Sequence, residues 1–147
     1  MPSARFLFAL VIIAVVIIVV VAVWVTSIRA AVDTLSCERP FGVEERAFPN
    51  DLPTGLTKAI RGKFGEIVPP GEKFDSTDRI VTGKNRRAIL VWVRDRRWVI
   101  ATEHGGLGYN DPVFAFDVSA DGSEAKLVAE AIAFPDSVCA IAAKQIQ

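Results

Sequence analysis

The residues best suited to chemistry lie in one stretch, from Glu103 to Pro112. It holds the only histidine and the only tyrosine of the chain, together with three glycines. Glycine tolerates positive φ, successive free amides can form an anion-binding concavity, and histidine titrates near neutral pH. The stretch therefore contains a candidate loop for a ligand or a partner, made of His104, Gly105, Gly106, Gly108, Tyr109 and Asn110.

A structural reading of the same loop stands beside the functional one. Glycines at this spacing are common wherever a strand connection bends sharply. The helix that follows a dinucleotide-binding or phosphate-binding turn is missing, because Pro112 leads into an expected strand. Glu103 and His104 are neighbours, so in a strand their side chains point to opposite faces.

The chain lacks the standard catalytic signatures. It has no paired-histidine metal motif, two-cysteine metal or redox motif, phosphate-cradling loop or nucleophile elbow. A nucleophile pair of Cys139 and His104 has no local motif behind it. We predict no catalytic residue, cofactor, metal or small-molecule ligand, and the sequence favours a non-enzymatic protein without deciding the question.

A second feature is a concentration of six basic residues within fourteen positions: Lys84, Arg86, Arg87, Arg94, Arg96 and Arg97. In a hairpin, Arg94, Arg96 and Arg97 lie at the tip. With Trp92 they form a candidate surface for an acidic protein or for anionic lipid headgroups. The alternative is a pair of solvated turns that keeps the hairpin soluble. With 17 basic and 17 acidic residues, the chain is not a strongly basic nucleic-acid binder.

The amino-terminal part is typical of a membrane anchor. Twenty consecutive apolar residues run from Phe6 to Val25, and as a helix they would span roughly 30 Å. A cleaved signal peptide is the alternative, but its apolar region is shorter and the best cleavage site here is poor. We predict a tail over 1–5, a transmembrane anchor over 6–28, a linker over 29–50 and an extracytoplasmic domain over 51–147.

The two cysteines bear on the compartment. Cys37 follows the apolar run closely and Cys139 lies near the other end of the chain. A disulfide between them would close a long loop and indicate an oxidising compartment. Two buried free thiols are the alternative. Positive charges flank both sides of the apolar run, so they do not settle its orientation.

The domain is predicted to be α+β, with an antiparallel meander of four or five strands and two short helices. Leu56, Ile60 and Phe64 recur at helical spacing between Pro53 and Gly65. A short strand is expected over 79–82. Two apolar runs flank residues 94–97 and predict a hairpin that pairs Val93 with Trp98. One of its faces carries Ile89, Val91, Val93, Trp98, Ile100 and Thr102, and the other carries Leu90, Trp92, Val99 and Ala101. Because both faces are apolar, these strands should be covered on both sides.

A second hairpin is expected to turn at Asp121-Gly122, a pair that suits a tight turn. Its register sets Phe116 opposite Leu127, Phe114 opposite Ala129 and Asp117 opposite Lys126. Residues 125–134 also fit a helical stripe, although a strand is favoured. A last helix is expected after Asp136 or Ser137, either of which can cap it.

Two functions from different classes follow. In the first, a single-pass protein of the bacterial inner membrane uses a periplasmic domain to bind another membrane or periplasmic protein, as an accessory subunit or assembly factor. In the second, the loop from Glu103 to Asp111 binds a small ligand or carries out catalysis.

Overall fold

The computed structural model describes residues 15–18, 35–75, 85–106 and 110–147. The chain divides into two compact units, residues 1–36 and residues 37–147. The strand expected over 79–82 lies outside the described residues. So do Gly108, Tyr109 and all of the expected anchor except residues 15–18.

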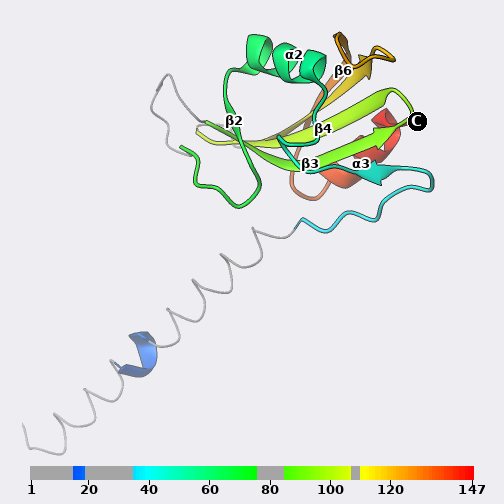
Figure 1. The fold of residues 1–147 in the computed structure, drawn as a ribbon. Coiled ribbons are helices and arrows are strands. Elements are labelled where there is room, and N and C mark those ends of the chain that lie inside the picture. Colours follow the sequence, from blue (N-terminus) through cyan, green and yellow to red (C-terminus); the bar gives the residue numbers. More distant parts are fainter. Residues whose placement is uncertain (1–14, 19–34, 76–84, 107–109) are drawn as a thin grey trace, which may run out of the picture. The chain divides into compact units, whose positions relative to one another are not determined.

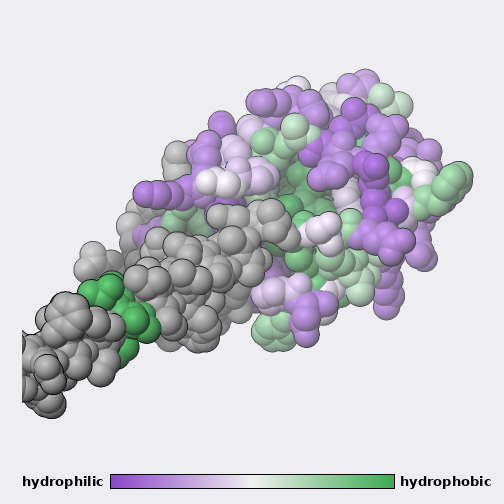
Figure 2. Space-filling view, turned by 90° about the horizontal axis from the view of Figure 1, so that it is seen from below, coloured by the Kyte–Doolittle hydropathy of each residue, from purple (hydrophilic) through white to green (hydrophobic). Residues whose placement is uncertain are grey.

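The first unit is described only in part. Residues 15–18 are helical, and their valine and isoleucine side chains are more than half exposed. They form the hydrophobic group of the first unit in Figure 2. Within the described ranges, no helix combines the length and the apolar composition that a membrane crossing requires.

The second unit is built on one six-stranded sheet. Five strands follow the order β1-β3-β4-β5-β6, and β2 also pairs with β3. The four long strands form the predicted antiparallel meander: β3 (Arg86–Arg94), β4 (Arg97–His104), β5 (Asp111–Val118) and β6 (Ala125–Ala133). Two short strands lie along the free side of β3. β1 (Glu44–Glu45) pairs antiparallel with its end, and β2 (Ile67–Val68) pairs parallel with its start.

The first hairpin has the predicted register, with Val93 opposite Trp98 and Val91 opposite Ile100. Asp95 adopts a φ of 55° in its turn. A bulge between Ala88 and Leu90 changes the predicted face pattern. Ala88 is wholly buried in the same cluster as Val91, whereas Ile89 is only partly buried. The inserted residue shifts the alternation, which a period of two cannot anticipate.

The second hairpin confirms the strand over 125–133 and the pairs Phe116–Leu127 and Asp117–Lys126. The prediction for Phe114 was wrong, because Phe114 lies opposite Glu130. Between Ala115 and Phe116 the register shifts by one residue, and Val128 is the extra residue on β6. Beyond this bulge every predicted pair is displaced by one position.

Two helices cover the two faces of the sheet (Figure 1). α2 (Thr54–Phe64) begins after Pro53 and ends at Gly65, as predicted, and packs on β5 and β6. α3 (Val138–Gln145) packs on β4, β5 and β6 and buries Val138 and Ala142. Strand side chains alternate between faces, so each helix covers one set of apolar residues. The expectation that the central strands are buried on both sides is confirmed.

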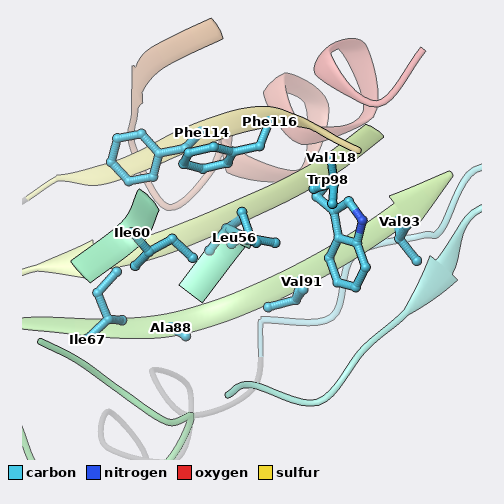
Figure 3. Close-up of a cluster of buried hydrophobic side chains, with 11 residues drawn as sticks. Leu56, Ile60, Ile67, Ala88, Val91, Val93, Trp98, Phe114, Phe116 and Val118 are labelled. Carbon is cyan, nitrogen blue, oxygen red and sulfur yellow. The ribbon is translucent and has the colours of Figure 1, made fainter. Parts of the chain in front are cut away.

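A cluster of buried hydrophobic side chains lies between α2 and the sheet (Figure 3). Leu56 and Ile60 of α2 meet Phe114 and Phe116 of β5, all at most 5 % exposed. The Phe64 ring lies 4.1 Å from that of Phe114, measured between centroids. This apolar burial is the main stabilising contribution that fixes α2 on the sheet.

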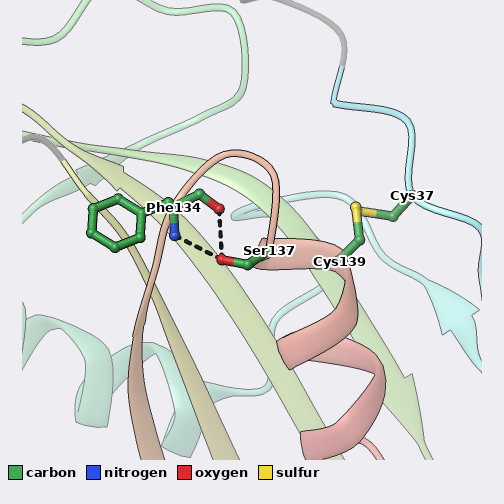
Figure 4. The surroundings of a disulfide bond; sticks show 4 residues. All are labelled: Cys37, Phe134, Ser137 and Cys139. Carbon is green, nitrogen blue, oxygen red and sulfur yellow. Dashed lines mark hydrogen bonds between the residues drawn. A yellow bond between two sulfur atoms is a disulfide. The ribbon is translucent and has the colours of Figure 1, made fainter.

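Residues 37–50, expected as a linker, belong to the folded unit. They carry β1 and the cysteine that joins this segment to α3. The predicted disulfide is confirmed: Cys37 and Cys139 are bonded, across a sequence separation of 102 (Figure 4). It ties the segment that follows the apolar run to the last helix of the domain.

Candidate functional site

The glycine-rich loop connects β4 to β5, and its described residues continue the ladder of these strands. The backbone N–H of His104 donates to the Asn110 carbonyl at 2.9 Å, and the two residues form an isolated bridge. Gly105 N donates to the Asn85 carbonyl at 3.3 Å. Gly106 has a φ of 104°, which glycine adopts without strain. The described part of the candidate loop therefore serves as a strand connection.

The His104 ring is held on the α2 side of the sheet. It lies opposite Arg86 of β3, and its Nε2 is 3.4 Å from Asn85 Nδ2. Burial lowers the pKa of His104, and the positive charge of Arg86 lowers it further. The lowered pKa favours the neutral ring, which can accept a hydrogen bond from the Asn85 amide.

A row of charged side chains crosses three strands on the face of the sheet opposite to His104. It includes Glu103, the residue before His104 in β4. Arg87 of β3 pairs with Glu103 of β4, and the ladder sets Asp111 of β5 beside Glu103. Arg87 Nη2 donates to Glu103 Oε2 at 2.5 Å and Nε donates to the same oxygen at 2.9 Å. Glu103 is buried, with its side chain 6 % exposed, and the Arg87 side chain is largely buried, at 12 % exposed. Phe74 covers the guanidinium, with its ring centroid 5.0 Å from the Arg87 carbon.

Asp111 is the perturbed member of this row. It is 3 % exposed. Burial raises its pKa to about 6, and the neighbouring Glu103 carboxylate contributes in the same direction. Two carboxylates placed side by side in a buried position disfavour their joint ionisation. No spacing in the sequence indicates this row, because only the register between three strands brings Arg87, Glu103 and Asp111 together.

The predicted basic surface lies at the other end of the β3–β4 hairpin. Arg97 Nε donates to Asp117 Oδ1 at 2.7 Å, and its Nη1 lies 3.4 Å from the Gln145 carbonyl oxygen. Arg94 and Arg96 are exposed, and neither side chain has an ionic or hydrogen-bonding partner among the described residues. The structure thus separates one paired arginine from two available ones.

A depression of about 610 Å³ lies beside this tip. It is bounded by the β3–β4 turn, the end of β5 and the end of the chain. Polar and charged side chains dominate its lining: Arg94, Asp95, Arg96, Arg97, Asp117 and Ser119. The hollow can accept a polar group that bears negative charge, because Arg94 and Arg96 offer unpaired guanidinium groups there.

Trp92, predicted together with the arginines, lies apart from this surface. It is 1 % exposed and pairs with Glu45 of β1 and Val99 of β4. Val91 and Val93 point towards α2. Trp92 lies between them in the strand, so its side chain points to the opposite face of the sheet, where it is buried.

Among the described residues, no group of three or more histidine, cysteine or acidic side chains is placed to hold a metal ion. Comparison of the chain with protein-family models, curated proteins and solved structures gives no match. The function is therefore inferred from the geometry of the domain.

Proposed function

We propose that this protein is a non-enzymatic interaction module, anchored by a single span and acting as an accessory subunit or assembly factor. Its domain lies outside the cytoplasm and binds another membrane or periplasmic protein. The disulfide supports an oxidising compartment, and the apolar run from Phe6 to Val25 supports the anchor. A bacterial inner membrane with the domain in the periplasm fits both features.

The observation that carries this proposal is the pair of available arginines beside the depression at the hairpin tip. Arginine binds carboxylates through two parallel hydrogen bonds and is enriched at protein interfaces. Arg94 and Arg96 flank Asp95 in a tight turn, so the backbone holds them close together. An acidic segment of a partner protein is the ligand that this surface favours.

The test is the native size of the protein after extraction in mild detergent. The unaltered chain is expected to migrate with other proteins in a larger assembly. The double variant Arg94→Glu/Arg96→Glu should leave that assembly, because the reversed charges repel an acidic partner. Lys58→Glu/Arg61→Glu is the matched control, since these basic side chains are equally exposed on α2.

Migration of the unaltered chain alone would contradict the proposal. So would an arginine double variant that stays in the assembly as fully as the α2 control. Identification of the co-migrating chains by mass spectrometry then gives the partner, whose contact segment should be acidic.

A further inference from the structure

The two edges of the sheet differ in whether further strands pair with them. On one side, β1 and β2 pair with the two ends of β3. On the other side, β6 is the last strand, and no described residue pairs with its outer edge along nine residues. Unpaired strand edges are templates for added strands, so proteins commonly protect them.

The direction of the backbone groups on β6 follows from the neighbouring ladder. Asn110, just before β5, and Val118 of β5 bond towards β4, through the bonds His104 N to Asn110 O and Val118 N to Arg96 O. The residues of β5 between them therefore alternate, and the odd-numbered ones bond towards β6. Their partners on β6 are Ala129, Ala131 and Ala133. The N–H and C=O groups of Glu130 and Ile132 consequently point out of the sheet.

Only the first half of β6 is protected against the addition of another strand. Lys126 and the bulge at Val128 disturb a flat edge there. In the second half, the Glu130 carboxylate is turned aside to Lys63 Nζ, 2.6 Å away on α2. The second half therefore offers a regular edge whose one carboxylate, that of Glu130, is paired with Lys63.

Exposed apolar side chains gather at this edge. Among the described residues of the folded unit, the exposed large hydrophobic side chains are Phe41, Val128, Ile132 and Phe134. Ile132 is 69 % exposed and Phe134 is 60 % exposed. The Phe134 backbone is nevertheless fixed, because its N–H and carbonyl both bond to the Ser137 hydroxyl, while its ring points away from α3 (Figure 4). Such a rigidly presented aromatic group is typical of a contact site.

We propose that the second half of β6 receives an extended segment of another protein as an added strand. The outward N–H and C=O groups of Glu130 and Ile132 require an extended backbone, which a helix cannot supply. Ile132 and Phe134 favour apolar side chains at the facing positions of this segment, whereas Glu130 favours a polar one. This proposal concerns a different surface from the basic tip and stands independently of it.

A second copy of this chain is the less suitable occupant. Antiparallel self-pairing can be centred on residue 130, 131 or 132. These registers set Glu130 opposite the other copy's Glu130, Ile132 or Phe134, respectively. Each pairs a carboxylate with a like charge or with an apolar side chain, which is unfavourable.

Photocrosslinking in cells tests the proposal with the full-length chain. Phe134 is replaced by p-benzoylphenylalanine, and the same replacement at Phe41, which is 98 % exposed, is the control. We expect a protein adduct from position 134 alone. In combination with Glu130→Pro the adduct yield should fall about tenfold, because proline removes an outward N–H while the bonds to β5 remain. Glu130→Ala removes the same carboxylate but keeps the N–H, so its yield should stay unchanged.

Absence of an adduct at position 134, or an adduct joining two copies of this chain, would overturn the proposal. An adduct equally abundant with Glu130→Pro and Glu130→Ala would also overturn it, because it would indicate side-chain docking without strand addition. If the proline variant does not form the disulfide, it has not folded correctly. Hydrogen exchange of the backbone amides in the unaltered protein then decides whether a strand is added. In the crosslinked assembly the amides of Glu130 and Ile132 should become protected, whereas that of Ala131 is protected throughout.

Discussion

At the scale of single residues, the buried charges explain more of this domain than the glycine-rich loop does. Arg87 and Glu103 are removed from solvent together and bonded to each other. Asp111 lies beside them with a raised pKa. Charges in such positions are costly unless they are paired, so each member depends on the others.

Removal of the guanidinium should show this dependence. Arg87→Ala should lower the free energy of unfolding by about 3–5 kcal/mol, because it removes one partner of a largely buried ion pair. Denaturant unfolding followed by circular dichroism measures the loss. The double variant Arg87→Met/Glu103→Leu should recover most of it, since neither charge then remains. A single variant as stable as Arg94→Ala, at the exposed tip, would contradict the expected cost.

Asp111 should give the stability a dependence on pH. Its pKa is about 6 in the folded protein and near 3.8 in the unfolded chain, so between these values the folded state binds the extra proton. The free energy of unfolding should therefore fall as the pH rises from about 4 to about 6. Asp111→Asn should remove this slope and be more stable than the unaltered protein at pH 7.

Urea unfolding at a series of pH values checks this expectation. Asp136→Asn, at an exposed position after β6, is the control and should keep the slope of the unaltered protein. Parallel profiles of Asp111→Asn and the unaltered protein would show that Asp111 does not carry the dependence.

At the scale of elements, the start of α2 is fixed against the β5–β6 turn. Gly55 N donates to the Gly122 carbonyl at 2.9 Å. A Cβ on Gly55 would lie 2.5 Å from the backbone nitrogen of Glu124 and 2.5 Å from the backbone carbon of Ser123. Such backbone atoms cannot yield as a flexible side chain can. The close approach therefore requires glycine at this position.

Replacement by alanine of two glycines in α2 should change the free energy of unfolding in opposite directions. Gly55→Ala should lower the free energy of unfolding by about 1–3 kcal/mol, because α2 must move away from the turn. Gly62→Ala should raise it by about 0.5–1 kcal/mol, since nothing lies within 4 Å of the added methyl group and alanine favours the helix. Thermal unfolding of both variants gives the comparison. A destabilising Gly62→Ala would mean that its surroundings are more crowded than described.

At the scale of the whole molecule, one covalent bond closes the folded unit. The disulfide joins Cys37, where the unit begins, to Cys139 in α3. A cross-link over such a long loop restricts the unfolded chain strongly. Beyond it, β1 and its contacts with β3 help to hold the segment that follows Cys37 in the sheet.

Loss of the bond should therefore destabilise the domain as a whole. Cys37→Ala/Cys139→Ala should lower the free energy of unfolding by about 2–5 kcal/mol, measured in denaturant. A reducing agent should destabilise the unaltered protein and leave the double variant unchanged. Equal responses of the two proteins to the reductant would exclude the disulfide as the cause.

Local patterns in the sequence were sufficient for much of the fold. The spacing of Leu56, Ile60 and Phe64 between Pro53 and Gly65 located α2. Alternating apolar residues around the two turns gave both hairpins, including the pairing of Val93 with Trp98. These features depend on neighbours within about twenty positions, where periodicity and turn chemistry act directly.

Tertiary structure alone decided what the domain presents to other molecules. β1 and β2 are too short to be recognised by periodicity, and they exist because β3 offers them an edge. The bulge at Val128 shifted the register of β6, and three strands had to align before Arg87, Glu103 and Asp111 met. Burial of Trp92 and exposure of Ile132 likewise depend on which elements cover each face. Such contacts join residues distant in the chain, and no local pattern encodes them.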